Sequence, residues 1–191
     1  EAVFLGYHPD YQTAMNFYYL RDKEELIFDF SLQAPLLMKR QIFAMLNHAL
    51  ERDLNRKNRR ELYIVPLKKF YLYCVEHKIE DIEELEYEDI LGFRNSMDGH
   101  VGTKTDIYMQ IVDNIRKFLF LNATKTNWKA NVWYMERFCF KGDRMNPAAQ
   151  VEAMHFYLVR NKENRRLLQE YMKYCIGVSS KAIRTLRSEY Y

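Results

Sequence analysis

Apolar residues recur at helical spacing along the middle of the chain, and this periodicity constrains the fold more than any other feature. Ile107, Ile111 and Ile115 follow one another at intervals that place them on one face of a helix. The 191 residues include only 6 glycines and 4 prolines. Few tight turns of the kind found in β-sandwiches and barrels are therefore available. We expect an all-α fold.

The first two of four expected helices lie on either side of a polar turn. Residues 36–53 place apolar side chains at the spacing of an amphipathic helix, namely Met38, Ile42, Met45, Leu46, Ala49 and Leu50. After the turn, Asn58 is expected to cap the second helix because Glu61 stands three positions later. Pro66 lies inside this second stretch. Either the helix kinks there, or an early turn ends and the main helix starts at Pro66.

Two further helices complete a four-helix bundle. The acidic residues 80–90 predict a turn and then a short helix, because apolar residues at core-like spacing interrupt the charges. Thr103 and Asp106 form a permissive capping box for the helix that carries the isoleucine stripe and runs to about residue 121. Residues 36–125 are therefore expected to form one helical module. An aromatic N-terminal lead at residues 1–35, which could include a short β-hairpin, precedes it.

Residues 126–191 are expected to form a linker and the start of a second helical module. A linker is expected at residues 122–127. Further along the chain, one helix is expected near residues 164–176, and another is expected to begin near Ser179 or Ser180. Displacing the sequence by 128 residues pairs Phe28 with Phe156, Gln41 with Gln169, Arg56 with Arg184, Arg59 with Arg187, Glu61 with Glu189 and Tyr63 with Tyr191. The same displacement places Phe43, Leu46 and Leu50 on Tyr171, Tyr174 and Val178. An aromatic lead, a helix, a basic turn and a helix thus recur in the same order. Because the sequence stops inside the last helix, we expect it to be part of a longer protein.

Charge is distributed unevenly along the chain. The net charge is only +3, but residues 39–69 carry +6 and residues 70–98 carry −7. Such asymmetry bears on partners more than on fold. The basic residues gather where the second helix begins, at the ends of the fourth helix, and at the matching junction of the second module. The candidate DNA contacts are Arg52, Arg56, Lys57, Arg59, Arg60, Lys68, Lys69, Lys104, Lys117, Lys125, Lys181, Arg184 and Arg187.

These positions favour phosphate as the ligand. Unpaired backbone N–H groups and the helix dipole attract anions to a helix N-terminus, and arginine adds bidentate donors. Contacts of this kind would give salt-dependent and largely sequence-independent affinity for double-stranded DNA. The competing interpretation is a solvated helix face that the neighbouring acidic segment neutralises.

The sequence carries no pattern for catalysis, for a cofactor or for a metal ion. Its three cysteines, Cys74, Cys139 and Cys175, have no zinc or disulfide spacing and indicate a reducing compartment such as the cytoplasm. Phosphate-binding glycine loops and nucleophile motifs are missing from the sequence, so neither a cofactor nor a small-molecule substrate is expected. The longest apolar run, residues 118–121, is far too short to cross a membrane.

Two stretches of the sequence carry a family resemblance. The first stretch consists of Arg59–Cys74, then Ile82-x-x-Leu85-x-x-x-x-Ile90-x-x-Phe93, and then Thr103 through Leu119. It resembles the helical, SAM-like core-binding domain of tyrosine recombinases of the phage-integrase family. The second stretch comprises Val132–Phe138, Arg144–Ala148 and Asn161-x-x-Asn164-Arg165 to Tyr174. It is similar to the N-terminal region of the large transposon-type members of that family.

The resemblance implies a fragment that positions a catalytic domain on duplex DNA for integration and recombination, beside other recombinase protomers. The catalytic signature of the family is an arginine, a lysine, a His-x-x-Arg pair and a nucleophilic tyrosine. None of the 5 histidines is followed by an arginine three residues later, so Tyr190 and Tyr191 are not matched to the nucleophile. This fragment is therefore not expected to be an enzyme. The alternative is a non-catalytic protein-interaction module that uses opposed acidic and basic faces.

Overall fold

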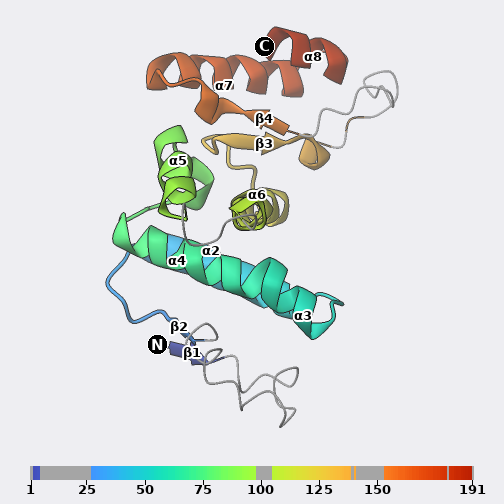
Figure 1. Cartoon of the computed structure of the whole chain (residues 1–191). Helices are drawn as coiled ribbons and strands as arrows, with labels where there is room; N and C mark the ends of the chain where they lie inside the picture. The colour runs from blue at the N-terminus through green and yellow to red at the C-terminus, as the bar shows by residue number, and fades with distance from the viewer. Residues whose placement is uncertain are drawn as a thin grey trace. The chain divides into compact units, whose positions relative to one another are not determined.

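Two compact units make up the described part of the chain (Figure 1). The computed structural model describes residues 2–4, 27–97, 105–138, 140, 153–179 and 181–190. One unit contains Glu1–Ile82 and Leu91–Ile115, and the other contains Glu83–Ile90 and Arg116–Tyr191. Most of the described residues are helical, which confirms the predominantly helical fold. None of the helices among them is both long enough and apolar enough to span a bilayer.

The first unit combines a strand pair with helices. Strands β1 (Ala2–Phe4) and β2 (Ile27–Asp29) are antiparallel, with Val3 opposite Phe28, so a short strand pair does occur in the expected N-terminal lead. The helices that follow in chain order are α2 (Leu36–Glu51), α3 (Arg56–Arg59), α4 (Val65–Glu76), α5 (Tyr87–Ser96) and α6 (Thr105–Asn122). Helix α5 begins in the second unit, and α6 ends in it. Short 3₁₀ turns occur at Ile82–Glu84, Met135–Phe138 and Phe156–Leu158.

Helix α2 packs its apolar stripe into the core of the first unit. Met38 and Ile42 are fully buried, as the periodicity predicts. Gln41 is buried between them, because its side-chain oxygen accepts the N–H of Ile82 at 2.9 Å and its nitrogen donates to Asp81 at 2.6 Å. These bonds satisfy the buried amide and fasten α2 to the segment that follows α4.

Helix α4 anchors strand β2. The Tyr71 hydroxyl donates to the carbonyl oxygen of Asp29 at 2.6 Å, and Lys68 Nζ donates to the carbonyl oxygen of Ile27. Phe28 is fully buried beside Tyr71, with ring centroids 6.2 Å apart. Burial, and then the charge of Asp29, raises the pKa of Tyr71 to about 12. The hydroxyl therefore keeps its proton and remains a donor at neutral pH.

A π-helical turn, Arg60–Ile64, joins α3 to α4 without a break. Proline has no N–H, and its ring opposes the carbonyl four residues earlier. The wider turn in front of Pro66 relieves this conflict, and the N–H of Val65 bonds to the carbonyl oxygen of Arg60, five residues back. The main α-helix thus begins beside Pro66, as one of the two interpretations predicts, but it continues an existing helical run.

The second unit contains two strands that the all-α prediction missed. Strands β3 (Val132–Tyr134) and β4 (Ala153–His155) are antiparallel, with Trp133 opposite Met154. Each has three residues, and every residue of β3 is buried, so no alternation of apolar and polar residues marks them in the sequence. Helices α7 (Lys162–Gly177) and α8 (Ile183–Tyr190) follow, and α7 lies along the strand pair in Figure 1.

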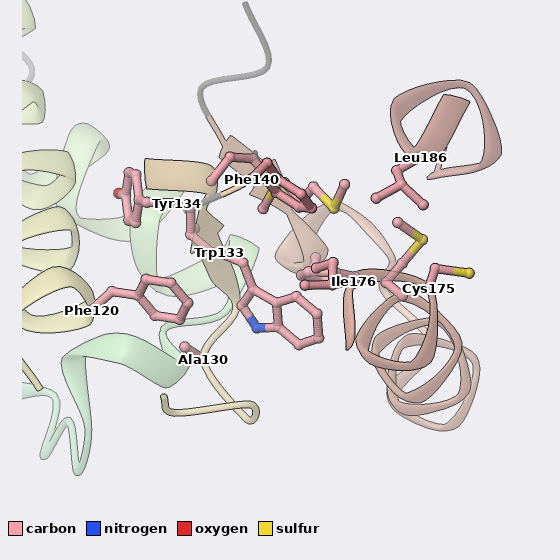
Figure 2. Close-up of a cluster of buried hydrophobic side chains, with 13 residues drawn as sticks. Phe120, Ala130, Trp133, Tyr134, Phe140, Cys175, Ile176 and Leu186 are labelled. Carbon is pink, nitrogen blue, oxygen red and sulfur yellow. The ribbon is translucent and has the colours of Figure 1, made fainter. Parts of the chain in front are cut away.

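Aromatic and aliphatic side chains fill the core of the second unit. Trp133 is fully buried, and its ring centroid lies 4.5 Å from that of Phe156. Figure 2 shows Phe120 from α6, Ile176 from α7 and Leu186 from α8 around the same cluster. The core therefore joins the end of α6, the strand pair and both C-terminal helices into one unit.

The expected linker at residues 122–127 is held in place by Arg137. Its guanidinium donates to the carbonyl oxygens of Leu121 and Ala123 at 2.9 and 2.7 Å, and its Nε donates to the Thr126 hydroxyl at 2.9 Å. The last carbonyls of a helix have no partner inside the helix, so Arg137 closes the C-terminal end of α6. This connection is consequently bonded along its length.

The two copies of the proposed repeat have the same order of elements, but their helices do not bury equivalent residues. Gln41 and Gln169 are both buried, and Gln169 donates to the carbonyl oxygen of Ala130 at 3.0 Å, so each glutamine fastens its helix to a backbone segment. However, the displacement of 128 residues pairs fully buried Leu46 with Tyr174, which is 59% exposed. The expected equivalence of the two apolar stripes is therefore wrong.

Candidate nucleic-acid interface

Helix α3 begins at Arg56, three residues earlier than expected. Asn55 caps it: its side-chain oxygen accepts the N–H of Asn58 at 2.9 Å, and its carbonyl oxygen accepts the N–H of Arg59 at 3.0 Å. The prediction that Asn58 is the cap is wrong, because Asn55 offers the same side chain one turn earlier. The basic residues consequently belong to the first turn of the helical run.

The start of α3 combines a helix N-terminus with a cluster of basic residues. Arg56, Lys57, Arg59 and Arg60 follow the cap, and the first turn of α3 contains no acidic residue. Cations at the positive end of a helix dipole are unfavourable unless an anion lies nearby. The helix dipole and the exposed side chain of Lys57 therefore favour an anion at this junction.

Two exposed cations border the junction. Arg52 follows the last turn of α2, and its guanidinium carbon lies 5.0 Å from the ring centroid of Tyr63, a distance at which the ring face attracts the cation. Lys57 is exposed, and Arg60 is half-buried. His48 adds no charge at neutral pH, because burial, and then the nearby Arg52, lowers its pKa below the usual value. The exposed positive charge of the junction thus comes from lysine and arginine.

Arg59 has a different position from its neighbours. Its side chain is only 6% exposed, and its guanidinium donates to the carbonyl oxygen of Arg52 at 2.8 Å. This bond closes the loop between α2 and α3 from the inside. Arg59 therefore fixes the geometry of the junction, whereas Arg52 and Lys57 face solvent.

The two lysines predicted on α4 also separate. Lys68 bonds to the backbone of β2, and its Nζ lies 5.6 Å from the ring centroid of Phe28, so its charge is used inside the first unit. Lys69 is exposed, on the helical run that begins at the junction. Of this pair, only Lys69 is placed to meet a ligand from solvent.

Two of the predicted basic residues of the second unit form ion pairs. Lys117 forms an ion pair with Glu136 at 2.7 Å, and Lys181 forms one with Glu189 at 2.5 Å. The hydrogen bond from Lys181 lowers the pKa of Glu189, and the same bond raises the pKa of Lys181. Lys125 is exposed and follows α6. These partners reduce the charge available to an external anion.

The side chains of four predicted contacts lie outside the described part of the structure. Lys104 lies outside the described residues. Arg184 and Arg187 belong to α8, and Arg56 belongs to α3, but the structure describes only the backbone of these three residues. Within the described part, the structure brings Arg52, Lys57 and Arg60 together at one junction.

Sequence reasoning missed the arginines that act inside the second unit. Arg165 is 5% exposed and makes two bonds to the carboxylate of Glu86, at 2.6 and 2.8 Å. Arg137 closes α6, and no local spacing distinguishes either residue from a solvated arginine. Comparison with known protein families, with curated proteins and with solved structures found no match to this chain.

Proposed function

We propose that this chain binds duplex DNA, as the non-catalytic, DNA-binding part of a tyrosine recombinase with a SAM-like core-binding fold. The observation that carries the proposal is the start of α3. There a capped helix N-terminus bears Arg56, Lys57, Arg59 and Arg60, and its first turn contains no acidic residue. This arrangement suits the phosphate backbone, which presents closely spaced anions.

The junction would contact phosphates and leave base sequence unread. Arg52 and Lys57 offer charged donors at its edge, and the Tyr63 ring orients the Arg52 guanidinium. Arg59 holds the loop that carries both residues. Contacts of this kind set the position of a protein on the duplex without specifying sequence. The catalytic domain of the longer protein would supply the chemistry.

The proposal predicts that charge reversal at the junction weakens DNA binding. The triple variant R52E/K57E/R60E should bind a random-sequence duplex at least about tenfold more weakly than the wild-type chain, because three phosphate contacts become repulsive. Fluorescence anisotropy with a labelled duplex measures the affinity. Circular dichroism checks that the variant keeps its helices.

A matched control changes the same net charge elsewhere. Arg40, Lys78 and Arg94 are exposed and lie outside the junction, so R40E/K78E/R94E should retain most of the affinity. Equal losses in both triple variants would contradict a localised site. Unchanged DNA binding in the junction variant, with an altered oligomeric state, would favour the protein-interaction module instead.

A further inference from the structure

His48 lies at the edge of the basic junction, and the proposed function does not use it. It belongs to the last turn of α2, and Arg52 caps the end of that helix four positions later. The charge of Arg52 acts on the His48 ring. The guanidinium of the same arginine lies over the Tyr63 ring, and its carbonyl oxygen accepts a bond from Arg59. His48 is therefore electrostatically coupled to a residue that borders the junction.

In the free chain the imidazole of His48 is neutral at pH 7. Burial disfavours the charged form of this half-buried ring, and Arg52 repels a second positive charge. Both effects lower the pKa of His48 below its usual value, with burial the larger of the two, and the attraction of Glu51 does not offset them. The imidazole is thus an unprotonated base beside a cation, so it can gain a charge when its surroundings change.

The helices packed against α2 bring further charges into the first unit. The helical run from α3 through the π-helical turn to α4 packs against α2. Its charged residues are Arg56, Lys57, Arg59, Arg60, Glu61, Lys68, Lys69 and Glu76. Arg52 nevertheless has the largest effect of any charged group on the pKa of His48. A ligand that neutralises Arg52 therefore removes the main electrostatic opposition to protonation.

The end of α2 is suited to a charged imidazole. The carbonyl groups of the last turn form the negative end of the helix dipole, which favours a cation at this position. His48 is only half-buried, so its ring also reaches water. Protonation thus requires no rearrangement of the fold once Arg52 is neutralised.

A DNA phosphate at the junction would change the balance at His48. In the proposed complex, phosphates lie against Arg52 and Lys57, and their negative charge attracts a proton to the imidazole. Backbone phosphates carry a fixed charge, so they add no titration of their own. The pKa of His48 is then higher in the complex than in the free chain. A group whose pKa rises on binding takes up a proton and strengthens binding as the pH falls.

We propose that His48 links DNA binding at the α2–α3 junction to pH by taking up a proton when duplex DNA binds. The inference rests on the proposed function, because the DNA phosphates supply the charge that draws the proton. Each unit by which binding raises the pKa of His48 increases the affinity about tenfold. The whole gain is present below the pKa of the free chain, and it is lost as the pH rises through the pKa of the complex.

Fluorescence anisotropy with a labelled duplex at pH about 5.5 and about 7.5, at constant ionic strength, tests the inference. Wild-type affinity should be at least about threefold higher at the lower pH. H48Q should match the wild type at the higher pH and lose most of the gain, whereas the permanently charged H48K should bind more tightly than the wild type at the higher pH. H77Q is the matched control, because His77 caps the opposite end of the helical run, and it should keep the wild-type gain.

NMR titration of the wild-type His48 ring, with and without the duplex, measures the proton uptake without relying on a variant. The pKa of His48 should be higher in the complex, and R52Q should raise it in the free chain because the main positive neighbour is gone. Equal pKa values in the free and bound chain, or an equal gain in the wild type and H48Q, would overturn this inference and leave DNA binding intact. Absence of duplex binding at both pH values would overturn the proposed function as well.

Discussion

At the scale of single residues, burial decides what a positive charge does. Arg59, Arg137 and Arg165 have the same side chain as Arg52, yet the first three bond to groups inside their own unit. The guanidinium has five donors in a rigid plane, so it can satisfy several carbonyl or carboxylate oxygens at once. Counting arginines along the sequence therefore overestimates the charge that faces a partner.

The Arg165–Glu86 pair should stabilise the second unit. R165M should lower the free energy of unfolding by about 2 kcal/mol at pH 7, below the range for fully buried pairs because the Glu86 side chain is still 29% exposed. Urea unfolding measures the difference. Lys162 lies 3.4 Å from the same carboxylate but is 80% exposed, so K162M is a matched control that should change stability by less than about 0.5 kcal/mol.

The same pair gives a pH dependence. Burial acts to raise the pKa of Glu86, but the hydrogen bonds and charge of Arg165, helped by Lys162, outweigh it and hold the pKa below its usual value. A carboxylate with a lowered pKa stabilises the folded state above its unfolded pKa of about 4.3, and the contribution is lost as pH falls through the folded value. The difference in the free energy of unfolding between the wild type and R165M should therefore decrease as the pH falls. A gap that stays constant below pH about 4 would contradict this assignment.

At the scale of elements, periodicity predicted helices α2 and α7 well, whereas the cap predicted at Asn58 was wrong. The stripe from Met38 to Leu50 gives α2 to within two residues of its observed end, and α7 lies where a helix is expected. Asn161 caps α7 by accepting the N–H of Asn164 at 2.9 Å. Local signals suffice here because an amphipathic helix records its buried face in its own sequence.

Other elements depend on contacts between distant segments. Strands β3 and β4 have three residues each and come together across a separation that no local pattern records. On α7, Leu167, Tyr171 and Tyr174 are exposed although they have the spacing of a core-facing stripe. Periodicity therefore could not tell which face of α7 is buried. For the candidate site, the sequence located the basic junction. The burial of Arg59 depends on its bond to the Arg52 carbonyl, which only the fold reveals.

The packing of α5 on α4 rests on the absence of a side chain. A Cβ added at Gly92 would lie 2.4 Å from the Tyr73 hydroxyl, far inside contact distance. Tyr73 is 7% exposed, and its ring lies 5.3 Å from that of Phe93, so it has little room to move. G92A should therefore destabilise the first unit by about 2 kcal/mol, a typical cost of overpacking.

A double-mutant cycle separates this clash from helix propensity. Y73F removes the oxygen that the new Cβ would meet, so G92A should cost less in the Y73F background than in the wild type. Thermal or urea unfolding of the wild type, G92A, Y73F and the double variant gives the coupling free energy between the two substitutions. Independent effects of the two substitutions would show that the backbone adjusts without involving Tyr73.

At the scale of the whole molecule, a net charge of +3 says little about any one surface, because basic residues differ in their exposure and in their partners. Arg52 and Lys57 are exposed at one junction, whereas Lys117 and Lys181 form ion pairs with carboxylates. Part of the acidic segment is likewise used internally, through Glu86. The electrostatic surface therefore differs from what the segment charges suggest.

This distribution predicts the salt dependence of DNA binding. With about six phosphate contacts, the logarithm of the association constant should fall with the logarithm of salt concentration with a slope of roughly −5. R52E/K57E/R60E should reduce the magnitude of the slope by about 3, because binding with fewer phosphate contacts releases fewer counterions from the DNA. R40E/K78E/R94E should keep the wild-type slope, because those residues are exposed outside the junction. A nearly flat dependence for the wild-type chain would mean that phosphate contacts do not drive its binding.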